Sequence, residues 1–438
     1  MPSKSDRICV VGAGPGGLSA AYFLVERGYA NVTVLERGGQ VGGKARTWWV
    51  DDTPIDLGAL DVGKEYRRVR ALADRFGLPL VKTARLGMMD LQTGRAASGM
   101  RALMQRVGRV KLGLMVLKYL YFTGLRYADD LERPGLAGMP ADLTAPMSVW
   151  LERHGLSEMT PIFDYTCTNF GYGPVETIPA AYMLRFIDLG DFLEVLEVDL
   201  GLRSWPRNFA RGYQGLWEAV AGQLPDVRLG VAIEGITRHP LESPAVRVRV
   251  AGQAEEEGFD HVIVACCLDE RLPALVTDLS MPERELFSRV INQPYSTTVC
   301  RVSGLPRLAL GTIPLTSQGR VYCLIRNWDD GGGCAVYMMN RDGLSHDALF
   351  DNLRRDLASI ETLDGQPVAI RVEEILHHED WTYFPHVSSD DMARGFFEEV
   401  EALQGRLRTY FTGGLLGFET VHNTMRYSEA LIDRFFPA

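Results

Sequence analysis

The residues best placed to do chemistry in this sequence are three glycines near its start and a carboxylate that follows them. Gly12, Gly14 and Gly17 follow the apolar run 8–11, and Glu36 closes the next apolar run. In a strand–turn–helix unit, the first glycine permits a tight turn, the second lets a pyrophosphate approach the backbone, and the third lets the helix pack on the strand. The helix N-terminus attracts phosphate, and a carboxylate about 20 residues further on binds ribose hydroxyls. The sequence therefore predicts dinucleotide binding rather than a chance glycine-rich turn.

A second pair of glycines distinguishes FAD from NAD as the dinucleotide. Gly42 and Gly43 come shortly after Glu36, and Lys44 and Arg46 add positive charge to the same stretch. NAD does not need such a pair, whereas the long diphosphate–ribityl arm of FAD requires backbone N–H groups to come very close, which glycine allows. Cationic side chains suit a phosphate neighbour. The alternative is a flexible surface loop.

These motifs resemble the N-terminal signature of the flavin-containing amine oxidase superfamily, which includes amine oxidases, carotenoid desaturases and protoporphyrinogen oxidases. The resemblance continues at the C-terminal end, where a strand from Thr409 enters a glycine turn and a helix over 421–436 follows. In the superfamily this helix points its N-terminus at the flavin and stabilises negative charge on it. Lys44 stands where an Arg is usual. Gly414 stands where a Glu usually contacts the ribityl chain, so that contact is lost or made by another group. The resemblance implies that FAD is bound by Gly12, Gly14, Pro15, Gly16, Gly17, Glu36, Arg37, Gly42, Gly43, Lys44, Gly58, Ala59, Val231, Gly413, Gly414 and Val421.

Blocks outside the glycine motifs look much like segments of bacterial FAD-dependent polyunsaturated fatty acid double-bond isomerases. The clearest are 169–182, 205–217 and 381–436. In such enzymes a hydride leaves a carbon between two double bonds and returns to another carbon of the same delocalised cation. That chemistry needs a dry apolar pocket, with aromatic faces to stabilise the cation. The resemblance implies a hydrophobic unsaturated substrate in a pocket lined by Arg85, Phe170, Tyr172, Trp381 and Tyr383.

Each pocket candidate has an alternative. The aromatic residues have packing in the core as their other role. Arg85 is the only basic residue in the stretch 84–89, where the fatty acid enzymes use basic side chains to anchor the substrate carboxylate. The alternative there is a ligand other than a free fatty acid carboxylate.

Two reactions remain open on this sequence. One is a redox-neutral double-bond isomerisation of a polyunsaturated acyl or polyene substrate. The other is an amine oxidase-like oxidation or desaturation, with electrons passed to oxygen or another acceptor. The resemblance over nearly the whole chain favours the isomerase, while the single basic residue at 84–89 and Gly414 keep the oxidase open. Amine oxidases of the superfamily often have a Lys near the flavin that holds a water, and no equivalent is identifiable, which disfavours amine oxidation.

Composition argues against several other classes of protein. The 438 residues carry a net charge of −10, which argues against nucleic acid as a partner. The seven cysteines include no C-x-x-C pair, so we expect free thiols in a reducing, cytoplasmic compartment. Only Cys9 lies within the N-terminal FAD motifs, inside the first strand, so we expect non-covalent FAD. No metal site is expected, because the adjacent His377 and His378 would point to opposite faces of a strand. We expect no signal peptide and no membrane-spanning run.

The order of the motifs predicts a fold of mixed class, α/β + α+β. It comprises a Rossmann-like FAD-binding domain of the glutathione reductase/amine oxidase type, an antiparallel-sheet substrate domain and a helical subdomain. A strand is expected over 227–233. The basic amphipathic stretch 101–118 is either an ordinary helix with a solvated face or a lipid or peripheral membrane contact. The expected parts are 1–80, 201–268 and 395–438 for FAD binding, 81–200 for a mostly helical cap, and 269–394 for the antiparallel sheet.

Overall fold

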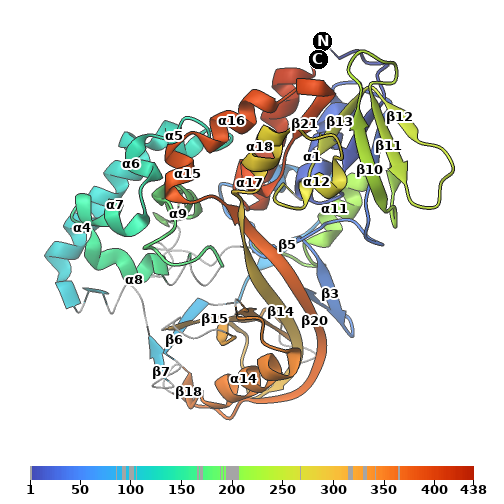
Figure 1. Cartoon of the computed structure of the whole chain (residues 1–438). Helices are drawn as coiled ribbons and strands as arrows, with labels where there is room; N and C mark the ends of the chain where they lie inside the picture. The colour runs from blue at the N-terminus through green and yellow to red at the C-terminus, as the bar shows by residue number, and fades with distance from the viewer. Residues whose placement is uncertain are drawn as a thin grey trace.

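Two large sheets, several small ones and a group of helices make up the described part of the structure, a computed structural model (Figure 1). The residues it describes are 2–84, 86–90, 95–97, 103–104, 106–164, 167, 171–187, 189–190, 192–193, 207–266, 268–313, 319–328, 333–340, 342–363 and 366–438. Two residues predicted to line the substrate pocket, Arg85 and Phe170, lie outside these ranges.

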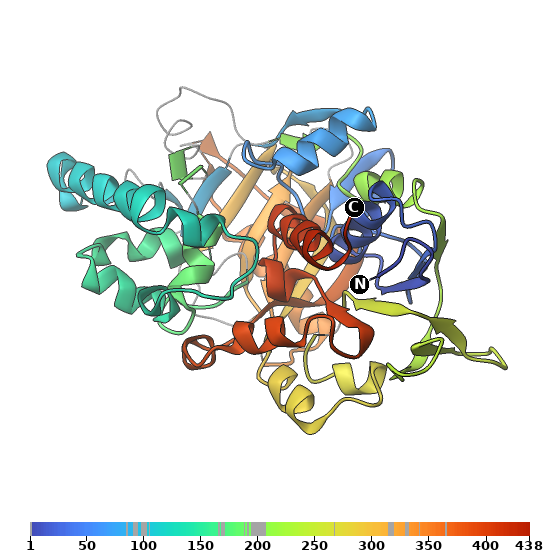
Figure 2. The same cartoon turned by 90° about the horizontal axis from the view of Figure 1, so that it is seen from above.

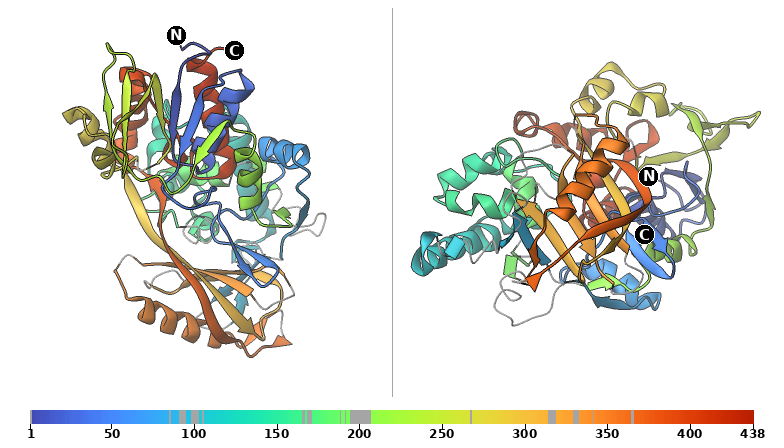
Figure 3. Two further views of the ribbon diagram at one scale, coloured as in Figure 1. Left: turned by 90° about the vertical axis from the view of Figure 1, so that its right-hand side faces the viewer. Right: turned by 90° about the horizontal axis from the view of Figure 1, so that it is seen from below.

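A parallel sheet forms the layer that contains both chain termini (Figures 1 and 3). Its strand order is β21-β13-β1-β2-β9, and every neighbouring pair is parallel. Four of these strands are buried along their whole length, as expected for a parallel sheet that is covered on both faces. The Rossmann-like domain is thereby confirmed. The strands are β1 (Ile8–Val11), β2 (Val32–Leu35), β9 (Asp226–Arg228), β13 (His261–Val264) and β21 (Thr409–Phe411).

The prediction of a single strand over 227–233 is wrong, because the structure has two separate strands there. Gly230 takes a left-handed conformation, with φ of +68°, and breaks the run into two strands. The first, β9, belongs to the parallel sheet. The second, β10 (Ile233–Arg238), turns away and pairs with β11 (Val246–Val250), which pairs in turn with β12 (Glu257–Phe259) in a small antiparallel sheet.

Two helices from opposite ends of the chain pack together against the parallel sheet. They are α1 (Pro15–Glu26) and α18 (Val421–Phe435), seen from above in Figure 2. The Ser428 hydroxyl donates a hydrogen bond of 3.0 Å to the Gly16 carbonyl. A Cβ on Gly16 would lie 2.9 Å from Gly413 Cα, so only glycine permits this approach. The N-termini of both helices are therefore held side by side. A further helix, α11 (Gln214–Ala221), also contacts α1.

A larger sheet forms the lower half of Figure 1. It is mostly antiparallel, as predicted, with one parallel pair, β15 with β6. Its two longest strands, β14 and β20, run from the parallel sheet to the far side of the molecule (Figure 3). Helix α14 (His346–Ala358) packs beneath it. In spatial order the strands are β20 (Arg371–His386), β14 (Ile291–Ser303), β17 (Gly333–Met339), β16 (Val321–Arg326), β15 (Leu308–Ile313), β6 (Leu86–Asp90) and β7 (Arg95–Ala97).

A helical subdomain projects to one side, on the left of Figures 1 and 2. Its longest helix is followed by one turn of π-helix over Phe122–Arg126. Its helices are α4 (Arg109–Tyr121), α5 (Ala128–Glu132), α6 (Ala141–Thr144), α7 (Met147–Arg153), α8 (Thr160–Phe163) and α9 (Ala180–Phe186).

Candidate active site

A cavity of about 580 Å³ is lined by residues from both sheets and from the helical subdomain. This volume is in the range of cofactor and small-molecule sites. Twelve of the sixteen residues predicted to bind FAD line it: Gly12, Gly14, Pro15, Gly16, Glu36, Gly43, Lys44, Gly58, Ala59, Gly413, Gly414 and Val421. The remaining four, Gly17, Arg37, Gly42 and Val231, do not belong to the lining.

Two glycine turns meet at one end of the cavity. Gly12 has φ of +102° and Gly43 has φ of +52°. A Cβ on Gly43 would lie 3.0 Å from Gly14 Cα, so the two turns are in contact without side chains between them. Gly14 is also the N-cap of α1 and has no side chain to cap the first turn. The backbone N–H groups at the start of α1 are therefore left for an anion, and this cradle fits the diphosphate of a dinucleotide.

Glu36 lies at the end of β2, beside the same cradle. Its carboxylate accepts hydrogen bonds from the backbone N–H groups of Ala13, at 2.8 Å, and Gly38, at 2.7 Å. Each carboxylate oxygen can accept more than one hydrogen bond, so capacity remains for hydroxyl groups in the cavity. Val231 is tied to this end of the strand, because its N–H donates to the Glu36 carbonyl at 2.8 Å.

A carboxylate that the motif analysis missed, Glu419, also lines the cavity. It forms an ion pair with Lys44 and accepts a hydrogen bond from the Phe384 N–H. Burial raises the pKa of Glu419, while Lys44 and the Phe384 N–H favour its charged form. The signal available in the sequence was its position immediately before Thr420, the N-cap of the last helix.

The C-terminal end of β20 closes the cavity between the two sheets. Phe384 has an uncommon left-handed backbone, with φ of +48°, and its carbonyl accepts a 2.7 Å hydrogen bond from His386 Nδ1. The neighbouring Tyr383 hydroxyl is buried and has no hydrogen-bond partner among the described residues. Burial raises the pKa of Tyr383 well above its ordinary value, so the phenol stays neutral. A molecule bound in the cavity could supply the hydrogen-bond partner that this buried hydroxyl lacks.

Two of the predicted pocket aromatics lie outside the cavity lining. Tyr172 is buried behind Phe384, with its ring centroid 4.3 Å away, and stacks on Phe418 at 5.1 Å. Trp381 shares a face of β20 with Tyr383, but its indole N–H donates to the Thr297 hydroxyl at 3.1 Å. Of the predicted aromatics that the structure describes, only Tyr383 lines the cavity.

The end of the cavity beneath the helical subdomain is mainly apolar. The apolar side chains of the lining come from the helical subdomain, from the large sheet and, for Leu60 and Leu268, from loops. Both cations of the described lining already face carboxylates: Lys44 pairs with Glu419, and Arg271 pairs with Asp269 at 2.5 Å. The apolar lining residues are Leu60, Ile162, Phe186, Ile187, Phe192, Leu268, Cys323 and Ile325.

A dinucleotide cradle that opens into an apolar chamber is the architecture of a flavoenzyme. A sequence model described as flavin containing amine oxidoreductase matches residues 15–409. The chain therefore belongs to the flavin containing amine oxidoreductase family, and it is an FAD-dependent enzyme.

Two solved structures are similar over the full chain. The CLA-producing fatty acid isomerase from P. acnes has a TM-score of 0.85 and 26% identity, with 100% of both chains covered. Putrescine oxidase bound to putrescine has a TM-score of 0.72 and 16% identity, with 99% of both chains covered, and this similarity concerns the fold alone.

Curated relatives also include oxidases. The FAD-dependent oxidoreductase dpasF of Apiospora sacchari is 21% identical over 93% of this chain and 87% of its own length. An L-amino-acid oxidase of Sistrurus catenatus edwardsii is 44% identical, but over only 18% of this chain and 15% of its own. Among the described helices, none combines the length and hydropathy needed to cross a bilayer.

Proposed function

We propose that this enzyme is a redox-neutral double-bond isomerase of a polyunsaturated acyl or polyene substrate. The observation that carries the proposal is the similarity, over the whole of both chains, to a fatty acid isomerase, at a TM-score of 0.85 against 0.72 for putrescine oxidase. The apolar lining contributed by the helical subdomain supports it, because a hydrocarbon chain needs such a surface.

The residues of the cavity hold the substrate and exclude water. When bound, FAD supplies a hydride acceptor that can also return the hydride. A hydride leaves the carbon between two double bonds and returns to another carbon of the same delocalised cation, so substrate and product have equal mass. Phe186, Phe192 and Phe384 provide aromatic surface beside that cation and keep water from capturing it. This hydride shift does not require a protein side chain to act as an acid or base.

The glycine cradle and its carboxylates are proposed to hold FAD. Gly12, Gly14 and Gly43 receive the diphosphate, and Glu36 binds ribose hydroxyls. Val231 offers backbone atoms to the adenine. We assign to Glu419 the contact with the ribityl chain for which the superfamily uses a Glu at the position of Gly414. Lys44 holds this carboxylate charged and in place.

We further propose that FAD is bound non-covalently. Cys9 is fully buried within β1 and does not line the cavity. Burial raises the pKa of the Cys9 thiol far above its ordinary value, so it is not a nucleophile. Flavin colour that stays with the polypeptide after acid precipitation would contradict this assignment.

An oxidase or desaturase is the second candidate, and the relative dpasF, an FAD-dependent oxidoreductase matched over 93% of this chain, favours it. One experiment separates the two. The yellow protein is incubated without oxygen with polyunsaturated acids, polyenes and amines, while flavin absorbance and product mass are recorded together. A product of unchanged mass with oxidised flavin at the end supports the isomerase. Bleached flavin that recovers with oxygen, and a product lighter by two hydrogens, would establish the oxidase or desaturase.

A further inference from the structure

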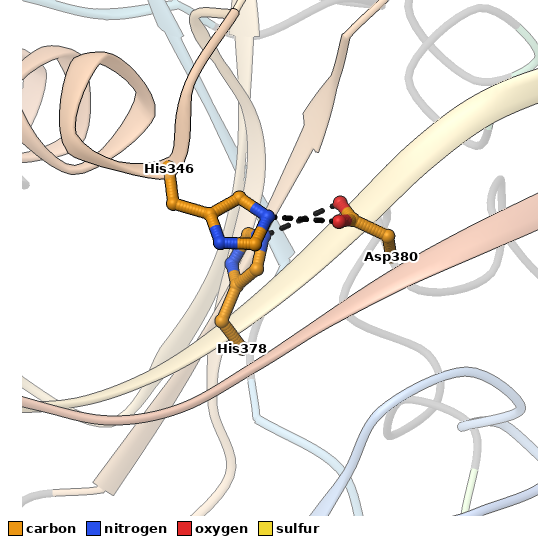
Figure 4. Close-up of side chains that lie close together, drawn as sticks. All are labelled: His346, His378 and Asp380. Carbon is orange, nitrogen blue, oxygen red and sulfur yellow. Dashed lines mark hydrogen bonds and ion pairs between the residues drawn. The ribbon is translucent and has the colours of Figure 1, made fainter.

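Three metal-binding side chains converge on the large sheet, outside the cavity (Figure 4). His346 is the first residue of α14, whereas His378 and Asp380 are two residues apart on β20 and share a face. Asp380 lies between the two rings: its Oδ2 is 2.9 Å from His346 Nε2, and its Oδ1 is 3.3 Å from His378 Nε2. One ligand atom of each residue lies within 4.8 Å of the other two.

The surroundings of His378 orient it as a ligand. Its Nδ1 is 2.8 Å from the Thr298 hydroxyl, which belongs to the residue directly opposite it on β14. The ring of Phe350 packs against it edge-on, with centroids 5.2 Å apart. A histidine that binds metal through one nitrogen is usually held by a hydrogen bond to the other. His346 and Asp380 are more than half exposed, so an ion can reach the site from solvent.

We propose that His346, His378 and Asp380 bind a divalent transition-metal ion, best matched by Zn²⁺ with water as its fourth ligand. Two imidazole nitrogens and one carboxylate oxygen are a common zinc ligand set. The ion joins the start of α14 to the long strand β20. The expectation of no metal site did not anticipate this cluster, because His346 is 32 residues upstream of His378 and no short spacing links the two.

The test is titration of the FAD-loaded, chelator-treated enzyme with ZnCl₂ by calorimetry, and with CoCl₂ by visible absorbance. We expect one equivalent to bind, with tetrahedral Co²⁺ bands. His346→Ala and Asp380→Asn should each weaken binding at least about tenfold, and Thr298→Val should weaken it less. His377→Ala is the matched control, because His377 stacks on Trp48 at 3.9 Å, away from the cluster. No saturable binding, or binding unchanged in His346→Ala and Asp380→Asn, would overturn the proposal.

An independent feature is the outward face of α4, which carries an apolar stripe. Its members recur at intervals of three or four residues, on one side of the helix. Each is at least half exposed: Val110, Leu114, Leu117 and Tyr121 of α4, and Leu125 of the π-helical turn that continues it. The opposite face, with Leu112, Met115 and Tyr119, is buried in the core. Only one of the two apolar faces of this helix is therefore packed.

The segment that carries the α4 stripe is basic in sequence. Residues 101–126 contain six Lys or Arg and no Asp or Glu, in a protein of net charge −10. Anionic lipid headgroups complement such a segment, because their negative surface potential attracts basic residues near the surface. A second copy of the chain packed on the same face would bring like charge against like.

We propose that the α4 stripe docks the enzyme on an anionic lipid surface, with the helix lying in the plane of the headgroups. The buried face of the same helix contacts the cavity lining: the Tyr119 and Phe192 ring centroids are 4.5 Å apart, and the Tyr119 hydroxyl donates to the Ile187 carbonyl. The helix thus lies between the lipid and the apolar end of the cavity. If the proposed function holds, an acyl substrate dissolved in the bilayer has a short path to its site.

Vesicle sedimentation tests the docking without any substrate. We expect the protein to sediment with vesicles of 70% phosphatidylcholine and 30% phosphatidylglycerol. A smaller fraction should sediment with vesicles of phosphatidylcholine alone, and the fraction bound to the anionic vesicles should fall as salt rises. Val110→Ser/Leu117→Ser should lower the partition coefficient at least about tenfold, as about 25 cal/mol is lost for each Å² of apolar surface. Leu241→Ser, at a fully exposed leucine far from α4 in sequence, should change nothing.

Two results would overturn the lipid proposal. One is the absence of sedimentation, or equal sedimentation of the double variant. The other is a dimer in light scattering that Val110→Ser/Leu117→Ser converts to a monomer, which would assign the stripe to a second copy. Neither assay depends on turnover, so a failure of the lipid proposal can be distinguished from a failure of the proposed reaction.

Discussion

The side chain of Glu419 fills the space that a side chain at Gly414 would need. A Cβ on Gly414 would lie 3.0 Å from Glu419 Cγ and 3.2 Å from its Cβ. The short helix α17 (Gly414–Gly417) folds the chain back so that residue 419 returns to the position of residue 414. Under the proposed assignment, the carboxylate that the superfamily takes from the residue after the glycine comes from five residues further along, and glycine at 414 leaves the space for it.

The first prediction is that the carboxylate can move from position 419 to position 414 only when both residues are changed at once. Gly414→Glu alone should crowd Glu419, and Glu419→Gly alone should leave Lys44 unpaired, so each should weaken FAD binding about tenfold or more. The double variant Gly414→Glu/Glu419→Gly should recover much of that loss. The measurement is the dissociation constant of FAD, from quenching of its fluorescence.

Glu429→Gln is the control for that series. Glu429 is on the same helix that follows Glu419, but it pairs with the exposed Arg68 on the surface. Its FAD affinity should match the wild type. A double variant no better than the worse single variant would refute the exchange.

A second prediction concerns Gly58, where the glycine arm passes beneath β20. A Cβ there would lie 2.0 Å from the Lys44 carbonyl oxygen and 2.2 Å from the Tyr383 hydroxyl. Gly58→Ala should therefore lower the free energy of unfolding by about 1–3 kcal/mol, because the core cannot accept the methyl group without moving backbone. Gly39→Ala has open space around it and should be near neutral. Equal urea midpoints for the two variants would contradict the close approach.

A third prediction concerns the dependence of stability on pH at His422. Burial, followed by Arg426 and Arg67, lowers the pKa of His422 to about 4, and the ring stacks on Tyr66. An unfolded histidine takes up its proton near pH 6.5, so between about 4 and 6.5 the unfolded chain binds more protons and stability falls as pH falls. At pH 5 this loss is about 2 kcal/mol relative to pH 7.5.

His422→Asn should remove that loss. The difference in unfolding free energy between wild type and variant isolates it from Asp56, whose buried carboxyl has a pKa raised to about 7 and acts in the opposite direction. Relative to the wild type, the variant should gain about 2 kcal/mol on moving from pH 7.5 to pH 5. His239→Asn, at the surface, serves as the comparison. A pH-independent difference for His422→Asn would show that the ring titrates freely in the folded protein.

A fourth prediction tests Arg85 as the anchor of an acidic substrate. Lys44 and Arg271 are already ion-paired, which leaves Arg85 as the cation predicted for this role. Arg85→Ala should raise KM for a free polyunsaturated acid about 10- to 100-fold, the value of a charged hydrogen bond, and leave KM for its methyl ester unchanged. An unchanged KM for the acid removes Arg85 from the site.

The dinucleotide cradle could be predicted because its determinants are local in sequence. Gly12, Gly14 and Gly43 act through backbone conformation, which residue type and spacing report directly. The alternation of strand and helix patterns along the sequence likewise predicted the parallel sheet. The break at Gly230 was missed because an apolar run looks the same whether one strand continues or two strands meet at a turn.

What the sequence did not reveal depends on contacts between distant segments. Glu419 enters the cavity through a fold-back that no periodicity reports. Tyr172 and Trp381 are aromatic and near the site in sequence, but which ring reaches the cavity depends on how β20 and the helices pack. His346 meets His378 only because α14 lies beneath the sheet. Such relationships follow from tertiary packing, which residue spacing does not encode.

The order of strands in the parallel sheet has a consequence for biosynthesis. Its edge strand, β21, lies at residues 409–411, and the helix beside α1 at 421–435, so the sheet draws on both ends of the chain. During synthesis on the ribosome, β1 and β2 are made first. Nearly four hundred further residues must follow before β21 is available to complete the sheet. The cofactor cradle cannot close before β21 and the helix at 421–435 have been made, and until then the edge of β13 that pairs with β21 is unpaired and open to contact with other chains.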